Sequence, residues 1–191
     1  MEFAIYFCIR NPSVQKKVQQ EIDKVFGHNR YPDAAERNQM PYTEATLLEV
    51  QRMANVLPVT VRSPTEDCTL DGYFVPQGTA GIVNIYSIHM DPTFWKDPYM
   101  FRPERFLDDK MKIIPEKATR VIPFGAGKRL CLGEQMAKFT LFSYFTSLLQ
   151  HYTFEDVTND NTSPQKMELK DFVDVGFTLS PKPYLVKVIK R

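Results

Sequence analysis

The stretch from Phe124 to Gly133, Phe-Gly-Ala-Gly-Lys-Arg-Leu-Cys-Leu-Gly, constrains the fold of this chain more than any other. Its first two glycines lie within three residues and predict a sharp turn, because glycine adopts backbone angles that other residues avoid. The segment that follows, Glu134 to Phe154, is apolar nearly all the way round a helix, which predicts a buried helix. Cys131 is therefore expected just ahead of a helix N-terminus.

The position of Cys131 gives its sulfur a predicted chemistry. Unpaired backbone N–H groups and the positive end of the helix dipole favour a thiolate over a neutral thiol, and Lys128 and Arg129 add positive charge. A thiolate held in this way serves as a nucleophile, a redox thiol or a metal ligand. The alternative is a free cysteine that packs as a small hydrophobic residue.

The spacing of the stretch, Phe-x-x-Gly-x-Arg-x-Cys-x-Gly, resembles the haem-ligand signature of the cytochrome P450 family. The matching residues are Phe124, Gly127, Arg129, Cys131 and Gly133. The resemblance implies that Cys131 is the axial thiolate of a haem iron and that Arg129 pairs with a haem propionate. It also implies that Phe124 packs beside the porphyrin and that the glycines let backbone amides approach the sulfur.

A second motif, Glu49-x-x-Arg52, lies in a helix predicted from Met40 to Ala54. Residues three apart share a helix face, so the two side chains are expected to pair, although such a pair is usually an exposed one of little weight. The resemblance implies that Arg105, in Arg102-Pro103-Glu104-Arg105-Phe106, joins them in a buried structural network beneath the haem.

Other site residues are implied by the resemblance alone. The extended segment from Val56 to Arg62 would pass over the haem, with Arg62 as a second propionate partner at a position where many relatives carry histidine. Candidates to line the substrate cavity are Val59, Thr60, Val61, Val175, Gly176 and Phe177.

Composition excludes several classes of protein. Among 191 residues, 43% are hydrophobic and 25% charged, which is ordinary for a globular chain and excludes disorder. A formal net charge of +1 gives no support to nucleic-acid binding. No window approaches the roughly 18 apolar residues of a membrane span. The cysteines are Cys8, Cys68 and Cys131, and the histidines are His28, His89 and His151. Their spacing fits neither a disulfide framework nor a zinc site nor an iron–sulfur cluster, so the histidines are interpreted as structural or exposed residues.

The remaining patterns predict a mainly α protein with small β-sheets, an α+β fold that would be the C-terminal part of the P450 fold. Helices are expected from the apolar stretch Phe3–Ile9 and after a cap at Asn11, and a hairpin at Asp71-Gly72. Further strands are expected over 79–88, 176–179 and 184–189, and a polar loop over 158–164.

Taken over essentially the whole chain, the resemblance implies a haem-thiolate monooxygenase of the microsomal type. Such an enzyme inserts one atom of O₂ into an apolar organic substrate, with electrons from an NADPH-dependent flavoprotein reductase, at the cytosolic face of the endoplasmic reticulum membrane. Glu134 and Gln135 favour this class, because mitochondrial members tend to carry arginines there. A reductase-docking face would include Lys117, Lys128 and Lys138.

Residues 1–191 are interpreted as a single partial domain, the haem-ligating C-terminal portion of a longer enzyme. The oxygen-activating helix, with its catalytic acid and threonine, and the membrane anchor are expected upstream, so this chain alone is expected to turn over no substrate. Two alternatives stay open. One is a truncated, catalytically incomplete haem-binding fragment, and the other is a haem-thiolate isomerase or dehydratase, against which the intact cysteine loop counts.

Overall fold

Helices carry most of the regular structure of this protein. The computed structural model describes residues 1–28, 30–157 and 172–191, so the loop predicted over 158–164 lies outside the described residues. The α-helices of this part are α1 (Glu2–Arg10), α2 (Pro12–Val25), α3 (Pro41–Ala54), α4 (Ile85–His89), α5 (Pro115–Thr119) and α6 (Glu134–His151). Short 3-10 helices are η1 (Ala34–Gln39), η2 (Pro103–Phe106) and η3 (Gly127–Arg129).

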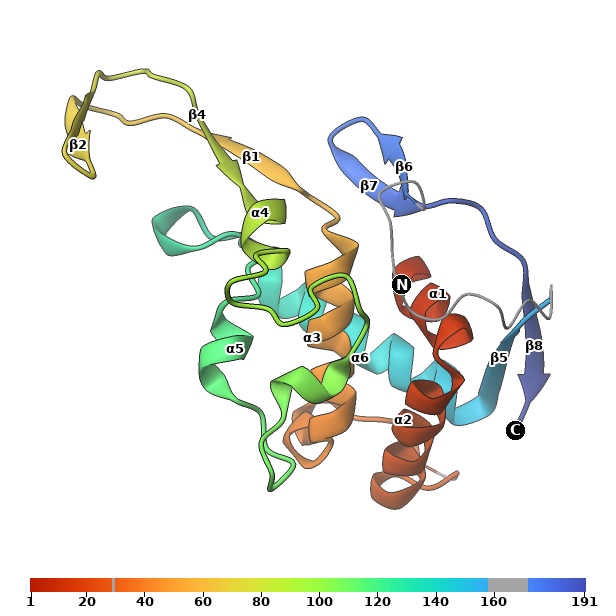
Figure 1. The fold of residues 1–191 in the computed structure, drawn as a ribbon. Coiled ribbons are helices and arrows are strands. Elements are labelled where there is room, and N and C mark those ends of the chain that lie inside the picture. Colours follow the sequence, from red (N-terminus) through yellow and green to blue (C-terminus); the bar gives the residue numbers. More distant parts are fainter. Residues whose placement is uncertain (29, 158–171) are drawn as a thin grey trace.

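The strands of the described residues form small antiparallel pairs rather than one large sheet. The pairs are β1 (Val59–Arg62) with β4 (Gly81–Asn84), β2 (Cys68–Leu70) with β3 (Tyr73–Val75), β5 (Tyr152–Asp156) with β8 (Val186–Lys190), and β6 (Phe172–Val175) with β7 (Thr178–Pro181). Figure 1 shows β1 and β4 as a ribbon that projects away from the helices. Helices with small sheets confirm the predicted α+β class.

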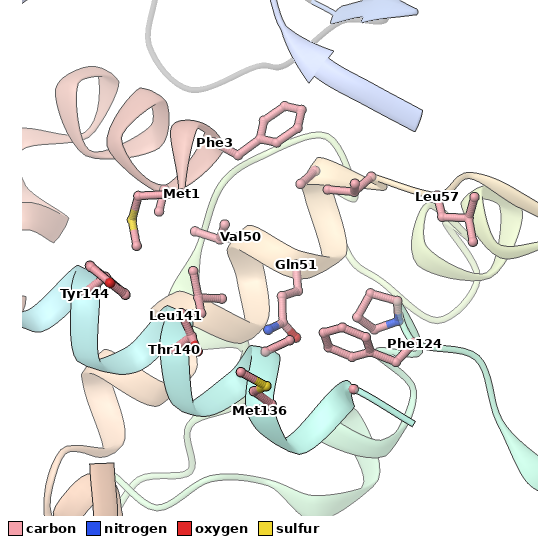
Figure 2. Close-up of a pocket in the computed structure, with 16 residues that line it drawn as sticks. Met1, Phe3, Val50, Gln51, Leu57, Phe124, Met136, Thr140, Leu141 and Tyr144 are labelled. Carbon is pink, nitrogen blue, oxygen red and sulfur yellow. The ribbon is translucent and has the colours of Figure 1, made fainter. Parts of the chain in front are cut away.

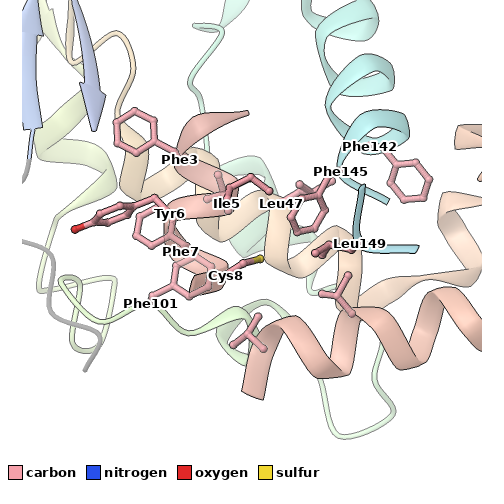
Figure 3. Packing of buried hydrophobic residues seen from close by; sticks show 14 of the residues in the cluster. Phe3, Ile5, Tyr6, Phe7, Cys8, Leu47, Phe101, Phe142, Phe145 and Leu149 are labelled. Carbon is pink, nitrogen blue, oxygen red and sulfur yellow. The ribbon is translucent and has the colours of Figure 1, made fainter. Parts of the chain in front are cut away.

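Helix α1 lies at the centre of the core. Every residue from Phe3 to Ile9 is buried, and the ring of Phe7 stacks on Phe101 with a centroid distance of 4.4 Å. Figure 3 shows the side chains of α1 in one cluster with Phe145 and Leu149 of α6. The prediction that this apolar stretch is helical is confirmed, and no helix in the described part is long and apolar enough to cross a bilayer.

Helix α2 starts at Pro12 as predicted, but the predicted side-chain cap is wrong. The Nδ2 of Asn11 donates to the carbonyl of Phe7 at 2.9 Å and does not bond the first turn of α2. The amide is turned back because Asn11 also follows the last residue of α1, whose final carbonyls need donors. Beyond the end of α2, Gly27 has a positive φ of 65°, a conformation that commonly terminates a helix.

The N-terminus of α3 takes its cap from another helix. The carboxylate of Glu21, on α2, accepts hydrogen bonds from the backbone N–H groups of Tyr42 at 3.0 Å and Thr43 at 2.7 Å. Two donors that α3 cannot satisfy internally are thereby paired with an anion at the positive end of the helix dipole. The contact joins α2 to the helix that carries Glu49 and Arg52.

Helix α6 differs from the buried helix that the sequence predicts. It ends at His151, and Phe154 lies in strand β5. The buried side chains lie on one face of its C-terminal half, while Met136 and Tyr144, which border a cavity on another face, are 77% and 60% exposed. Apolar composition all round a helix shows that each face suits an apolar partner, but it does not show that this chain supplies the partner.

Two strand predictions need correction. The segment predicted as one strand over 79–88 is β4 followed by α4, because the side chain of Asn84 accepts a bond from the backbone N–H of Ser87 at 3.0 Å and begins a helix. Gly176 and Phe177 lie in the turn between β6 and β7 rather than in a strand. The predicted hairpin is confirmed, with Asp71 and Gly72 both at positive φ between β2 and β3.

Candidate functional site

The cysteine loop joins α5 to α6 and is closed by its own backbone. The N–H of Cys131 donates to the carbonyl of Phe124 at 3.0 Å, which forms the neck of the loop. Inside it, Gly125 and Gly127 have φ of +80° and +71°, so both turn positions require a residue without a Cβ. Gly133 is the N-cap of α6, and Cys131 is a free, exposed cysteine just before it.

The position of Cys131 agrees with the placement predicted from the sequence and not with a cysteine packed in the core. Its sulfur is not crowded, since a Cβ built on Gly133 would lie 3.9 Å from Sγ, an ordinary contact. An exposed sulfur at the start of a helix can reach a ligand that approaches from outside the loop.

The two arginines predicted to bind propionates lie together. Arg62 is the last residue of β1 and Arg129 the last of η3, and a guanidinium nitrogen of Arg62 lies 3.5 Å from the carbonyl oxygen of Arg129. The same guanidinium donates to Thr60 Oγ1 at 2.8 Å, which holds it along the strand. Both arginines are exposed, so a positively charged patch lies beside the cysteine loop.

An apolar cavity of about 670 Å³ opens between α1, α3 and α6. Figure 2 shows Val50 and Gln51 of α3 facing Met136 and Leu141 of α6 across it, with Phe124 at one end. The volume lies within the range of about 300 to 1,000 Å³ typical of cofactor and small-molecule sites. The residues that line it are Met1, Phe3, Ala4, Val50, Gln51, Ala54, Val56, Leu57, Pro123, Phe124, Gly133, Met136, Ala137, Thr140, Leu141 and Tyr144.

Of the residues predicted from the cysteine signature, Phe124 and Gly133 border this cavity. The predicted substrate residues do not. Val59, Thr60 and Val61 lie on β1, beyond Val56 and Leu57 that do line the cavity, and their contact with a substrate stays a prediction. The other candidates lie at or beside the β6–β7 turn: Val175, Gly176 and Phe177.

The structure brings Glu49, Arg52 and Arg105 into one buried network. Glu49 and Arg52 are wholly buried and form two hydrogen bonds, of 2.7 and 2.9 Å. The Nε of Arg105, on η2, donates to the same carboxylate at 2.9 Å, and so does the backbone N–H of Arg102. One carboxylate therefore joins α3 to η2, in the arrangement that the resemblance implies.

The remaining donors of this network are satisfied by backbone carbonyls. Arg105 donates to the carbonyls of Lys96 at 2.8 Å and Met100 at 2.9 Å, and Arg52 donates to that of His89 at 2.8 Å. Buried ions are tolerated only when their hydrogen-bonding groups are paired in this way. The network therefore holds the loop between α4 and η2 against α3. Helix α3 also forms one wall of the cavity.

His89 has a structural role that its position in the sequence does not reveal. Its side chain is wholly buried between Asn55, at the end of α3, and Ile122, just before the cysteine loop. No local spacing connects these three residues, so only the tertiary structure could have identified the contact.

The sequence profile of the cytochrome P450 family matches residues 1–188 of this chain. The chain belongs to the cytochrome P450 family. Among curated relatives, Cytochrome P450 2U1 of Rattus norvegicus is 45% identical over 191 residues, which cover 99% of this chain and 34% of the relative. Cytochrome P450 2J2 of Homo sapiens is 42% identical over 182 residues, 95% of this chain and 34% of the relative. The chain thus spans about a third of the length of these P450s.

The residues present fit the haem of a P450. An exposed cysteine at a helix N-terminus would offer a soft sulfur ligand, the cavity beside it would offer an apolar surface, and two exposed arginines would offer positive charge for carboxylates. Phe124 and Gly133 connect the cysteine loop to the cavity, and the contact between Arg62 and Arg129 connects the loop to the end of β1.

Proposed function

We propose that this chain holds the haem-thiolate site of a P450 monooxygenase, with Cys131 as the axial ligand. The observation that carries the proposal is the exposed Cys131 on a glycine loop whose flanking residues, Phe124 and Gly133, border the apolar cavity. Haem, when bound, would supply the redox-active iron at which oxygen is activated.

The residues of this chain would bind and orient the cofactor. Gly125 and Gly127 shape the turn that presents the sulfur, and Phe124 offers its ring to the apolar cavity. Arg62 and Arg129 would hold the two propionates by charge-assisted hydrogen bonds. The apolar face of α6 would exclude water from the region next to the ligand.

We further infer that the whole protein inserts one atom of O₂ into an apolar organic substrate, with electrons from an NADPH-dependent flavoprotein reductase at the endoplasmic reticulum membrane. Membership of the P450 family supports the monooxygenase class, and the acid–amide pair Glu134-Gln135 supports the microsomal type. Two lysines of the predicted docking face have partners within the chain: Lys138 pairs with Glu134 at 2.6 Å, and Lys117 donates to the Arg105 carbonyl at 2.7 Å.

Residues 1–191 would be the haem-ligating C-terminal portion of this enzyme and would turn over no substrate alone. Support comes from the exposed apolar side chains that face the cavity side of α6, such as Met136 and Tyr144, which need cover in water. Reductase- and NADPH-dependent oxidation by the purified 191-residue chain would contradict this inference.

The test of the ligand is a haem titration followed by the carbon monoxide difference spectrum of the reduced form, with Cys131→Ala as the control. We expect a strongly red-shifted Soret band that the control lacks. A band at the shorter wavelength of thiol- or histidine-bound haem in a chain extended upstream would overturn thiolate ligation by Cys131. Loss of the band only in the 191-residue chain would favour the incomplete fragment.

A further inference from the structure

The imidazole of His89 makes one hydrogen bond on each side of its ring. The backbone N–H of Ile122 donates to Nε2 at 2.9 Å, and Nδ1 lies 2.9 Å from Oδ1 of Asn55. The side chain has no exposed surface, so water does not compete for either bond. His89 is the last residue of α4 and thus reaches two segments that are distant in the sequence.

The surrounding bonds select one neutral tautomer. The amide group of Asn55 donates to the carbonyl of Arg52 at 2.9 Å, so its oxygen faces the ring and accepts from Nδ1–H. Nε2 is then free to accept from Ile122. Burial, and next the charge of Arg52, lower the pKa of His89 to about 4, so the ring is neutral at pH 7.

These bonds connect the buried ion network to the cysteine loop. Asn55 ends α3 in a left-handed conformation with φ of 42°, and Arg52 donates to the His89 carbonyl at 2.8 Å. On the other side, the carbonyl of Ile122 accepts from the N–H of Gly125 at 3.0 Å, inside the loop that carries Cys131. The backbone carbonyl of His89 is thus bonded to Arg52 of the buried ion network, and its ring is bonded to Ile122, in the segment that leads into the cysteine loop.

We propose that His89 is a positioning residue for Cys131, which holds the start of the cysteine loop at a set distance from the end of α3. The inference rests on the proposed role of Cys131 as haem ligand. Without the ring, the N–H of Ile122 would lack its acceptor in a partly buried place, and the segment would shift or open to find another. A shift of the loop would move the sulfur away from the position where it meets the iron.

Two substitutions separate the two sides of the ring. In His89→Gln the terminal amide oxygen reaches about as far as Nε2 and retains an acceptor for Ile122. In His89→Asn the amide reaches only as far as Nδ1, so the bond to Asn55 can be kept while that to Ile122 is lost. Both variants remove the aromatic ring and are neutral, so differences in volume and charge are small.

The experiment uses the full-length protein that contains this chain, expressed with haem. The first readout is the fraction of reduced, CO-bound haem with the red-shifted thiolate band. We expect His89→Gln to keep most of it, and we expect the ratio of thiolate-bound to other haem to fall about fivefold in His89→Asn relative to His89→Gln, as one hydrogen bond of about 1 kcal/mol implies. The second readout is amide hydrogen exchange over residues 120–131, which should be faster only in His89→Asn.

The outcomes distinguish this inference from the proposed function. If the parent protein lacks the thiolate band, the proposed function fails, while hydrogen exchange still tests the link between His89 and the loop. Equal band loss in both variants, or none in either, would overturn the positioning role. Should His89→Asn fail to fold, a folded His89→Gln without the thiolate band would overturn it as well.

Discussion

Two pairs of arginines occupy opposite environments in this protein. Arg52 and Arg105 are buried around the carboxylate of Glu49, and backbone carbonyls accept their other hydrogen bonds. Arg62 and Arg129 are exposed beside the cysteine loop, and within the described residues neither forms an ion pair with a carboxylate. The first pair finds its anion within the chain. The second has no such anion among the described residues, and we propose that it binds one from outside the chain.

The two environments indicate two roles: the buried arginines stabilise the fold, and the exposed arginines belong to the candidate site. The protein can bury charge at Glu49 because every partner is covalently part of the fold and is placed there when it forms. At the cysteine loop, by contrast, two arginines are exposed to solvent, next to an exposed sulfur and an apolar cavity. Substitutions in the buried pair should therefore alter stability, and those in the exposed pair should alter ligand binding.

The largest effect is expected from Glu49→Gln. The amide cannot neutralise two buried guanidinium groups, so the free energy of unfolding should fall by about 3 to 5 kcal/mol. Chemical denaturation measures the change. The matched control is Glu155→Gln, which removes an exposed pair with Lys187 and should cost less than about 1 kcal/mol. Equal losses in the two variants would remove the contrast between buried and exposed charge.

The same contrast can be tested with aromatic residues on one helix. Phe145→Ala removes a ring with no exposed surface from the inner face of α6 and should cost about 3 to 5 kcal/mol. Phe139→Ala, near the N-terminal end of the same helix where the ring is 56% exposed, should cost less than about 1 kcal/mol in this chain. Both are measured by denaturant unfolding. A large loss from Phe139→Ala would mean that this end of the helix is already covered.

The pH dependence of stability should show the buried His89. Its pKa is about 4 in the folded protein, below the ordinary 6.5, because burial disfavours the charged ring. The unfolded chain therefore takes up a proton first, and stability is present above pH 6.5 and is lost as the pH falls towards 4. The loss should approach about 3 kcal/mol. The contribution of His89 is the difference in the free energy of unfolding between the parent and His89→Gln, measured between pH 6.5 and 4. Parallel curves for the two proteins would contradict the prediction.

The smallest effect on stability is expected at the exposed arginines. Arg62→Leu and Arg129→Leu should each change the free energy of unfolding by less than about 0.5 kcal/mol. Each should nevertheless weaken haem binding by roughly tenfold, the value of one charge-assisted hydrogen bond. Haem titration of the two variants, with Lys128→Leu as control, checks this prediction. Unchanged haem affinity would show that the propionates bind elsewhere.

Local sequence was sufficient for much of the scaffold. The pair Glu49 and Arg52 lies on one helix, so its ion pair follows from helix periodicity, and the Asp71-Gly72 turn follows from the preference of these residues for positive φ. The predictions from local sequence were wrong where a side chain can form its hydrogen bond with more than one backbone group. Asn11 bonds backwards to α1 rather than forwards to α2, and Asn84 starts a helix inside an expected strand.

The sequence by itself determined the family, the fold class and the residues of the cysteine loop, because these depend on residue type and spacing along the chain. Tertiary structure alone decided which face of α6 is buried, that Arg62 meets Arg129, and that His89 joins α3 to the loop. The physical reason is the same in each case. Burial and hydrogen bonding between distant segments depend on which surfaces the fold brings together, and periodicity within one segment does not contain that information.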